Sequence, residues 1–259
     1  MAKSIIVQQF LSNQISLQEV MERLLYIVIG LNDGATANWI KNELYGYKSN
    51  SDTPEYRVFS LTPMGSYLVG NLHYQNMALM TIGVPDDLLD AWNHHHHNAP
   101  LSTITSQIEA IKGGNKIMIP IPPEFFVYFN KNTNGHVTNA NLLISEFDLE
   151  NIVAQIRTRV IELLSLLETN LGCLDDFDAG AMGLSSKEQE NLKGAMSQVI
   201  NHGSITTYNI VTRKSIKKSR IGSNNDMSNE NKTDVQSTVN IGEKKESWFK
   251  RIFKRLFRL

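Results

Sequence analysis

Four consecutive histidines, His94–His97, are the densest group of potential metal ligands in the sequence. Neighbouring side chains do not share one face of a helix or a strand, so four in a row cannot converge on one ion. Neither a cysteine nor a carboxylate completes a tetrahedral set beside them. The stretch follows a predicted helix and precedes Pro100. We interpret it as a cluster of histidines in a surface loop, to which the sequence assigns no function.

The remaining nucleophiles and acids also lack partners for catalysis. Cys173, the only cysteine, has no basic neighbour, and the acidic residues that follow it disfavour the thiolate. Asp175, Asp176 and Asp178 lack the ligand spacing and the closing glutamate of a calcium loop. The sequence contains no phosphate-binding loop, GxSxG or HExxH motif. We therefore predict no catalytic residue, no metal and no cofactor.

Glu43 and Arg57 form a different kind of candidate, because aromatic residues surround both of them in the sequence. A partly buried carboxylate–guanidinium pair would hold the helix that carries Glu43 against the strand that follows Arg57. Removing one partner of such a buried pair costs about 3–5 kcal/mol. The pair is therefore predicted to stabilise the fold rather than to catalyse a reaction.

The residues around this pair carry a family likeness. The run Trp39-Ile40-Lys41-Asn42-Glu43-Leu44-Tyr45-Gly46-Tyr47, followed after a polar gap by Pro54-Glu55-Tyr56-Arg57-Val58, resembles the N-terminal signature of AbiTii-type abortive-infection domains. A second stretch, from His136 to Glu168, resembles the final strand and long helix of that domain. The resemblance spans about residues 1–172. It implies bacterial defence against phage through growth arrest or death of the infected cell, and it supplies no catalytic residue.

Apolar periodicity predicts an α+β fold dominated by helices. Helical spacing over residues 2–30, with a capping box at Ser16 and Glu19, predicts an N-terminal helical hairpin together with a helix over 35–44. A continuous apolar stripe predicts a long helix over 148–170. Further helices are expected over 86–92, 102–114 and 185–198. Residues 54–59 are expected to form a turn that enters a short strand. Further short strands are expected over 65–70 and 200–212, and the proline-rich run 116–130 should be extended, with an edge strand.

Charge and composition divide the chain into unequal parts. Residues 211–259 hold 13 Lys and Arg against 5 Asp and Glu, although the whole chain has a formal net charge of −1. Such asymmetry is typical of a basic tail with an acidic partner. We predict four parts: an AbiTii-like domain (1–172), a helix and strand extension (173–212), a flexible linker (213–243) and a basic amphipathic helix (244–259).

The last twelve residues separate completely into two halves on a helical wheel of about 100° per residue. One half is apolar and aromatic, and the other is entirely cationic. The apolar half consists of Trp248, Phe249, Ile252, Phe253, Leu256, Phe257 and Leu259. The cationic half consists of Lys250, Arg251, Lys254, Arg255 and Arg258. This pattern fits a helix that lies in the interface of an anionic membrane.

Three functions remain open on this evidence. The first is a non-enzymatic defence effector that acts through oligomerisation, through membrane engagement by residues 248–259, or through both. The second is an assembly module whose tail packs within a homo-oligomer, and the third is a metal-dependent nuclease or nucleotide hydrolase. A phage or host protein would serve as the trigger, and nucleic acid is the less favoured partner. No apolar run reaches the ~18 residues of a membrane span. We therefore expect a cytoplasmic protein, peripheral at the inner membrane.

Overall fold

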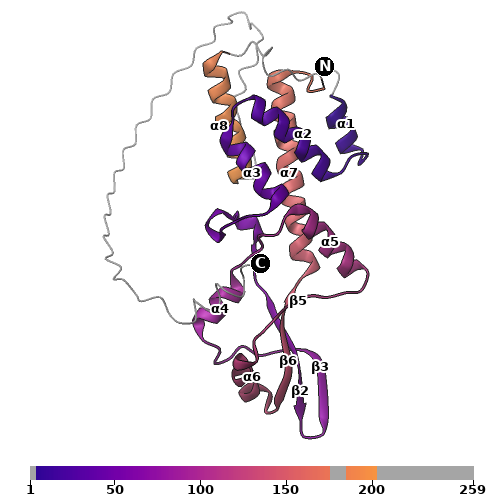
Figure 1. Ribbon diagram of the computed structural model, residues 1–259, viewed down its shortest axis with the longest axis vertical. Helices are drawn as coiled ribbons and strands as arrows, with labels where there is room; N and C mark the ends of the chain where they lie inside the picture. Colours follow the sequence, from indigo (N-terminus) through magenta and orange to yellow (C-terminus); the bar gives the residue numbers. More distant parts are fainter. Residues whose placement is uncertain (1–3, 176–184, 203–259) are drawn as a thin grey trace, which may run out of the picture. The chain divides into compact units, whose positions relative to one another are not determined.

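The computed structural model describes residues 4–175 and 185–202, all within the first of two compact units, Met1–Tyr208. Helices dominate these residues, and a small antiparallel sheet accompanies them, which confirms the predicted α+β class (Figure 1). The α-helices are α1 (Ile5–Leu11), α2 (Leu17–Gly30), α3 (Gly34–Tyr45), α4 (Asp86–Asn93), α5 (Leu101–Lys112), α6 (Phe126–Thr133), α7 (Glu146–Leu171) and α8 (Ser186–His202). Single 3₁₀ turns are η1 (Asn50–Asp52), η2 (Glu55–Arg57) and η3 (Pro123–Phe125).

The helical stretch predicted over 2–30 forms two helices, α1 and α2, and the predicted capping box lies at the start of the second. The chain leaves α1 at Ser12, and Asn13 adopts a positive φ of 56°. Helix α2 then starts at the predicted capping box: Ser16 Oγ accepts from the Glu19 amide at 3.1 Å, and Glu19 Oε2 accepts from the Ser16 amide at 2.7 Å. Local capping therefore fixes the start of α2 and interrupts the helical run.

Helix α7 is the longest helix of the described residues and carries the predicted apolar stripe. Its buried side chains include Leu149, Ile152, Ile156, Val160 and Leu163. It packs against α2, α5 and α8, and Figure 1 shows these helices around it. Helix α8 also contacts α3, so α8 belongs to the same packed body although it lies beyond residue 172.

Strands form two antiparallel sheets. The larger sheet has the order β3-β2-β6-β5, and the smaller one pairs β1 with β4. The strands of the larger sheet are β2 (Thr62–Val69), β3 (Leu72–Ala78), β5 (Ile117–Pro120) and β6 (His136–Ile144), and those of the smaller sheet are β1 (Val58–Phe59) and β4 (His95–His96). Strand β5 is an edge strand, as the prolines near it predicted.

Two further sequence predictions need correction. Residues 126–133 form α6, not an extended chain, because Pro122 and Pro123 open a 3₁₀ turn from which the helix continues. Residues 200–202 belong to α8 rather than to a strand. The rest of the strand predicted over 200–212, the linker 213–243 and the helix 244–259 lie outside the described residues. No helix in the described part of the chain has the length and apolarity needed to cross a bilayer.

Candidate functional site

The signature residues meet at one place, where α3, η2 and the segment after β4 come together. We name Trp39, Glu43, Tyr47, Tyr56 and Arg57 the signature cluster. Capping positions its two main elements: Asp33 accepts from the amides of Ala35 and Thr36 at the start of α3, and Pro54 precedes η2. The remaining signature residues frame the cluster, with Leu44 buried on α3 and Gly46 at its C-terminus.

The predicted Glu43–Arg57 pair is present, and both side chains are completely buried rather than partly so. Arg57 Nε donates to both carboxylate oxygens of Glu43, at 3.3 and 3.1 Å, and Nη2 donates to Oε2. Arg57 Nη1 donates to the carbonyls of His97 and Ala99 at 2.9 and 2.8 Å. The buried guanidinium thus has the Glu43 carboxylate as its counter-charge and two carbonyl oxygens as further hydrogen-bond acceptors, as a buried ion pair needs. The pair therefore ties α3 and η2 to the chain after β4.

Two tyrosines donate further hydrogen bonds to the Glu43 carboxylate. The hydroxyls of Tyr47 and Tyr56 both donate to Oε1 at 2.5 Å, and Trp39 Nε1 donates to the Tyr56 hydroxyl at 3.0 Å. Burial and the neighbouring Glu43 carboxylate raise the pKa of both tyrosines well above the usual value. Both hydroxyls therefore remain protonated donors at neutral pH. This arrangement suits a structural network and not proton transfer.

Arg159 extends the network to α7 and α8, and the sequence analysis did not find it. Its guanidinium carbon lies 4.2 Å from the ring centroid of Tyr56, and Nε donates to the carbonyl of Ile200 at 3.2 Å. That carbonyl lies in the last turn of α8, where a cation is favourable. The sequence does contain a signal that Arg159 is buried, because Arg159 falls within the apolar stripe of α7, three residues after Ile156 and four before Leu163.

Gly46 closes the cluster at the end of α3. Its φ is +90°, and a Cβ at this position would lie 2.8 Å from the Asn98 carbonyl oxygen and 3.3 Å from Pro100 Cδ. The next amide, of Tyr47, donates to the same Asn98 carbonyl at 2.9 Å. Only a glycine allows this close approach of the two backbones.

Replacing Gly46 with alanine should therefore lower the free energy of unfolding by at least about 2 kcal/mol, through backbone strain and overlap with Asn98. Urea titration of the purified protein measures the change. Gly70→Ala is the matched control, because Gly70 also has a positive φ (+59°) but nothing within 4 Å of its Cβ position. Equal losses in both variants would show that the contact with Asn98 contributes nothing.

The histidine run lies beside this cluster, and it is a surface loop only at His94, which is exposed at the end of α4, whereas the other three residues depart from the prediction. His95 and His96 form β4 opposite Val58 and Phe59 of β1. His97 is buried, and its Nε2 lies 3.2 Å from Gln107 Oε1. The rings of His95 and His97 pack against the Phe59 ring, with centroids 5.4 and 5.8 Å away. These side chains pack inward because the strand pairing draws the run against β1.

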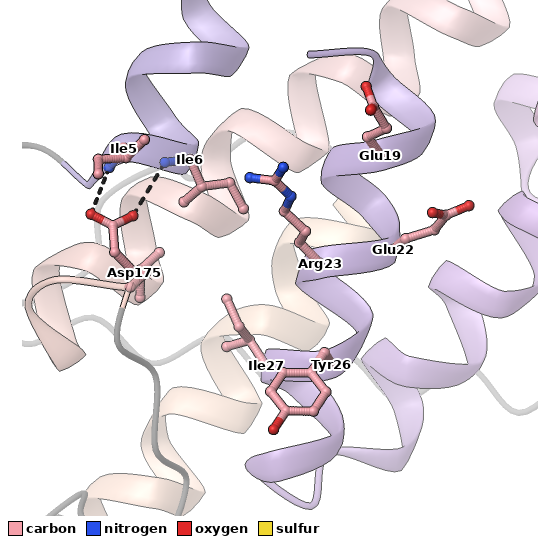
Figure 2. Close-up of a pocket in the computed structure, with 9 residues that line it drawn as sticks. Ile5, Ile6, Glu19, Glu22, Arg23, Tyr26, Ile27 and Asp175 are labelled. Atoms are coloured by element: carbon pink, nitrogen blue, oxygen red, sulfur yellow. Dashed lines mark hydrogen bonds between the residues drawn. The ribbon is translucent and has the colours of Figure 1, made fainter.

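An open groove of about 720 Å³ lies between α1 and α2, and its lining includes Glu19, Arg23, Tyr26 and Asp175 (Figure 2). Asp175 accepts from the amides of Ile5 and Ile6 at 2.8 and 3.3 Å, so it caps the start of α1. Glu19 belongs to the capping box, and Arg23 Nη1 lies 3.4 Å from Gln9 Oε1. Asp175 and Glu19 thus cap the starts of the two helices, and the contact of Arg23 with Gln9 joins α2 to α1.

Cys173 and Asp175 also lie together, since the Cys173 thiol donates to Asp175 Oδ2 at 3.3 Å. Asp176 and Asp178 lie outside the described residues, as do all the tail residues from Trp248 to Leu259. Within 4–175 and 185–202, the positions of His, Cys, Asp and Glu side chains provide no group of three or more that could hold a metal ion.

These features define a packed α+β domain whose signature residues serve an internal polar network. The chain belongs to the AbiTii family, whose model matches residues 4–193. The match includes the whole signature cluster and continues into α8. Membership of this family places the protein in abortive-infection defence against phage. No curated protein and no solved structure matches the chain.

Proposed function

We propose that this AbiTii protein is a non-enzymatic abortive-infection effector that acts on the inner membrane through residues 248–259. The family match supports the role in phage defence. The observation that carries the mode of action is the complete separation of apolar and cationic residues over the last twelve positions. In this proposal the packed domain is the scaffold, and the C-terminal residues are the part that acts.

The signature cluster supports a scaffold role for the domain. Its carboxylate and its guanidinium bind each other, and both tyrosine hydroxyls point at the same carboxylate oxygen. Fully engaged polar groups hold elements together but offer no acid, base or nucleophile to a substrate. A domain of this kind can fix the position of a tail without carrying out chemistry.

The composition of residues 248–259 supports lipid as the target. Each large apolar side chain gains about 1.5–3 kcal/mol when buried, and each of the five basic residues adds about 1 kcal/mol near anionic lipid. Phosphate binding to a nucleic acid needs the cations but makes no use of a continuous aromatic half. A membrane interface uses both halves at once.

Phe253→Glu in the full-length protein tests the proposal, because it places a negative charge within the apolar half. Binding to vesicles that contain phosphatidylglycerol should weaken at least about tenfold, which is the loss expected from one buried aromatic side chain. In cells, plaque counts on a phage that the wild type restricts should rise to those of cells lacking the protein.

Phe253→Leu is the matched control, since it keeps an apolar side chain at the same position and should retain both vesicle binding and protection. Vesicles of phosphatidylcholine alone separate the charge contribution from the apolar one. Full protection by Phe253→Glu, or equal vesicle binding by both variants, would refute the membrane mechanism and leave only the family assignment.

A further inference from the structure

The outer edge of β3 is an open strand edge. In the sheet order β3-β2-β6-β5, β3 pairs with β2 on one side. On the other side, no strand of the described residues pairs with it. Figure 1 shows the β2–β3 hairpin with β3 as its outer strand. The backbone N–H and C=O groups along that edge are therefore available to a further strand.

The edge also lacks the charged residues and prolines that commonly protect an open strand edge. Charged side chains, especially lysine, and prolines commonly keep a further strand from pairing with an open edge, as do bulges. Here the three segments that form the sheet, residues 58–85, 117–123 and 132–145, contain no Asp, Glu, Lys or Arg, although such residues make up 20% of the chain. The sheet is thus a neutral region within a charged protein.

Apolar side chains are exposed along this edge. Leu72 is 61% exposed, Met77 is 44% exposed and Tyr74 is 38% exposed. Leu72 lies opposite Val69 of β2, and Tyr74 lies opposite Tyr67, whose ring stacks on it at 5.0 Å between centroids. Cross-strand partners share a face of the sheet, so these residues form one apolar strip beside the open edge.

We propose that the occupant of this edge is β3 of a second copy of the chain, paired antiparallel across a two-fold axis. The two β3 strands would then join the two four-stranded sheets into one continuous sheet. Two-fold pairing sets each strand against itself, and a neutral strand meets no like charge when this happens. Each copy's exposed Leu72 and Tyr74 supply apolar neighbours for the same residues of the other copy.

Neutrality also argues against the other possible occupants. An anionic membrane or a nucleic acid is attracted by basic residues, and this sheet contains none. The regular part of the edge is short, because a bulge interrupts the pairing with β2 and Asn76 has a positive φ of 52°. Such an edge buries less than a standard interface, so the dimer should be weak, with a Kd on the order of 1 µM or above.

Light scattering after size exclusion tests the proposal on the full-length protein without lipid, so its outcome is independent of the proposed membrane contact. The wild-type mass should rise from monomer to dimer between low and high micromolar concentrations. Leu72→Lys and Tyr74→Lys, each at an exposed position, should remain monomeric throughout. Phe147→Lys, at a 75%-exposed position of α7, is the control and should behave like the wild type. Circular dichroism confirms folding of each variant.

Disulfide cross-linking locates the interface. In a Cys173→Ser background, a single cysteine placed in turn at positions 72–75 should give a covalent dimer on mild oxidation at one or more positions near the two-fold axis. A cysteine at Val127, half-exposed on α6, should not. A wild type that is monomeric at every concentration, a dimer that survives both lysine variants, or the absence of cross-linking at all four positions would each overturn the proposal.

Discussion

Replacing Glu43 with glutamine should lower the free energy of unfolding by about 3–5 kcal/mol. The change keeps the size of the side chain but removes its charge, and Arg57 then remains buried without a counter-charge. The two tyrosine hydroxyls also lose a charged acceptor, which makes their hydrogen bonds weaker. Urea titration at neutral pH measures the loss.

Glu22→Gln is the matched control, because Glu22 is exposed on α2 and the same substitution should change stability by less than about 0.5 kcal/mol. The double variant with Glu43→Leu and Arg57→Leu should lose less than the sum of the two single variants, since it leaves no isolated charge behind. A loss of under about 1 kcal/mol for Glu43→Gln would contradict the structural role assigned to the pair.

A phage assay distinguishes the structural role of Glu43 from the membrane role proposed for Phe253. A destabilised scaffold reduces the amount of folded protein, so Glu43→Gln should reduce protection in proportion to its abundance in the cell. Phe253→Glu should leave abundance unchanged and remove protection. Comparing plaque counts with protein levels for the two variants therefore distinguishes a residue that holds the domain together from one that acts on the membrane.

The parts of the fold that could be predicted are those that local chemistry determines. The capping box at Ser16 and Glu19 sets the start of α2 through two hydrogen bonds within four residues. The stripe of α7 repeats often enough to define a buried face. The Glu43–Arg57 pair could be anticipated because both residues lie among aromatic residues in the sequence, and a charge buried among them needs an opposite charge as a partner.

The parts that could not be predicted depend on contacts between distant segments. The histidine run reads as a loop until its pairing with β1 turns it into β4. The position of Arg159 in the apolar stripe of α7 indicates burial, but its partners, Tyr56 and the end of α8, lie far away in the sequence and become visible only in the fold. Strand β3 carries no alternation of buried and exposed residues, because all seven of its residues are exposed, and so the usual period of two gives no signal.

His95 and His97 lead to the second large effect: stability should fall as the pH is lowered from about 7 to about 4. Burial lowers the pKa of both His95 and His97 from 6.5 to about 4. Below pH 6.5 the unfolded chain binds protons on these imidazoles, whereas the folded protein does not until about pH 4. Proton uptake therefore favours unfolding across this window, by about 3 kcal/mol for each histidine at its lower end.

Urea titrations at several pH values between about 4 and 7 measure the slope, which should reach about 1.4 kcal/mol per pH unit for each of the two histidines. His97→Gln keeps a polar side chain near Gln107 and should flatten the slope by one histidine's share. His73→Gln, at an exposed position of β3, should leave it unchanged. If His97→Gln and the wild type lose stability equally on acidification, His97 is not held neutral by the fold, and the packing of β4 against β1 has no electrostatic consequence.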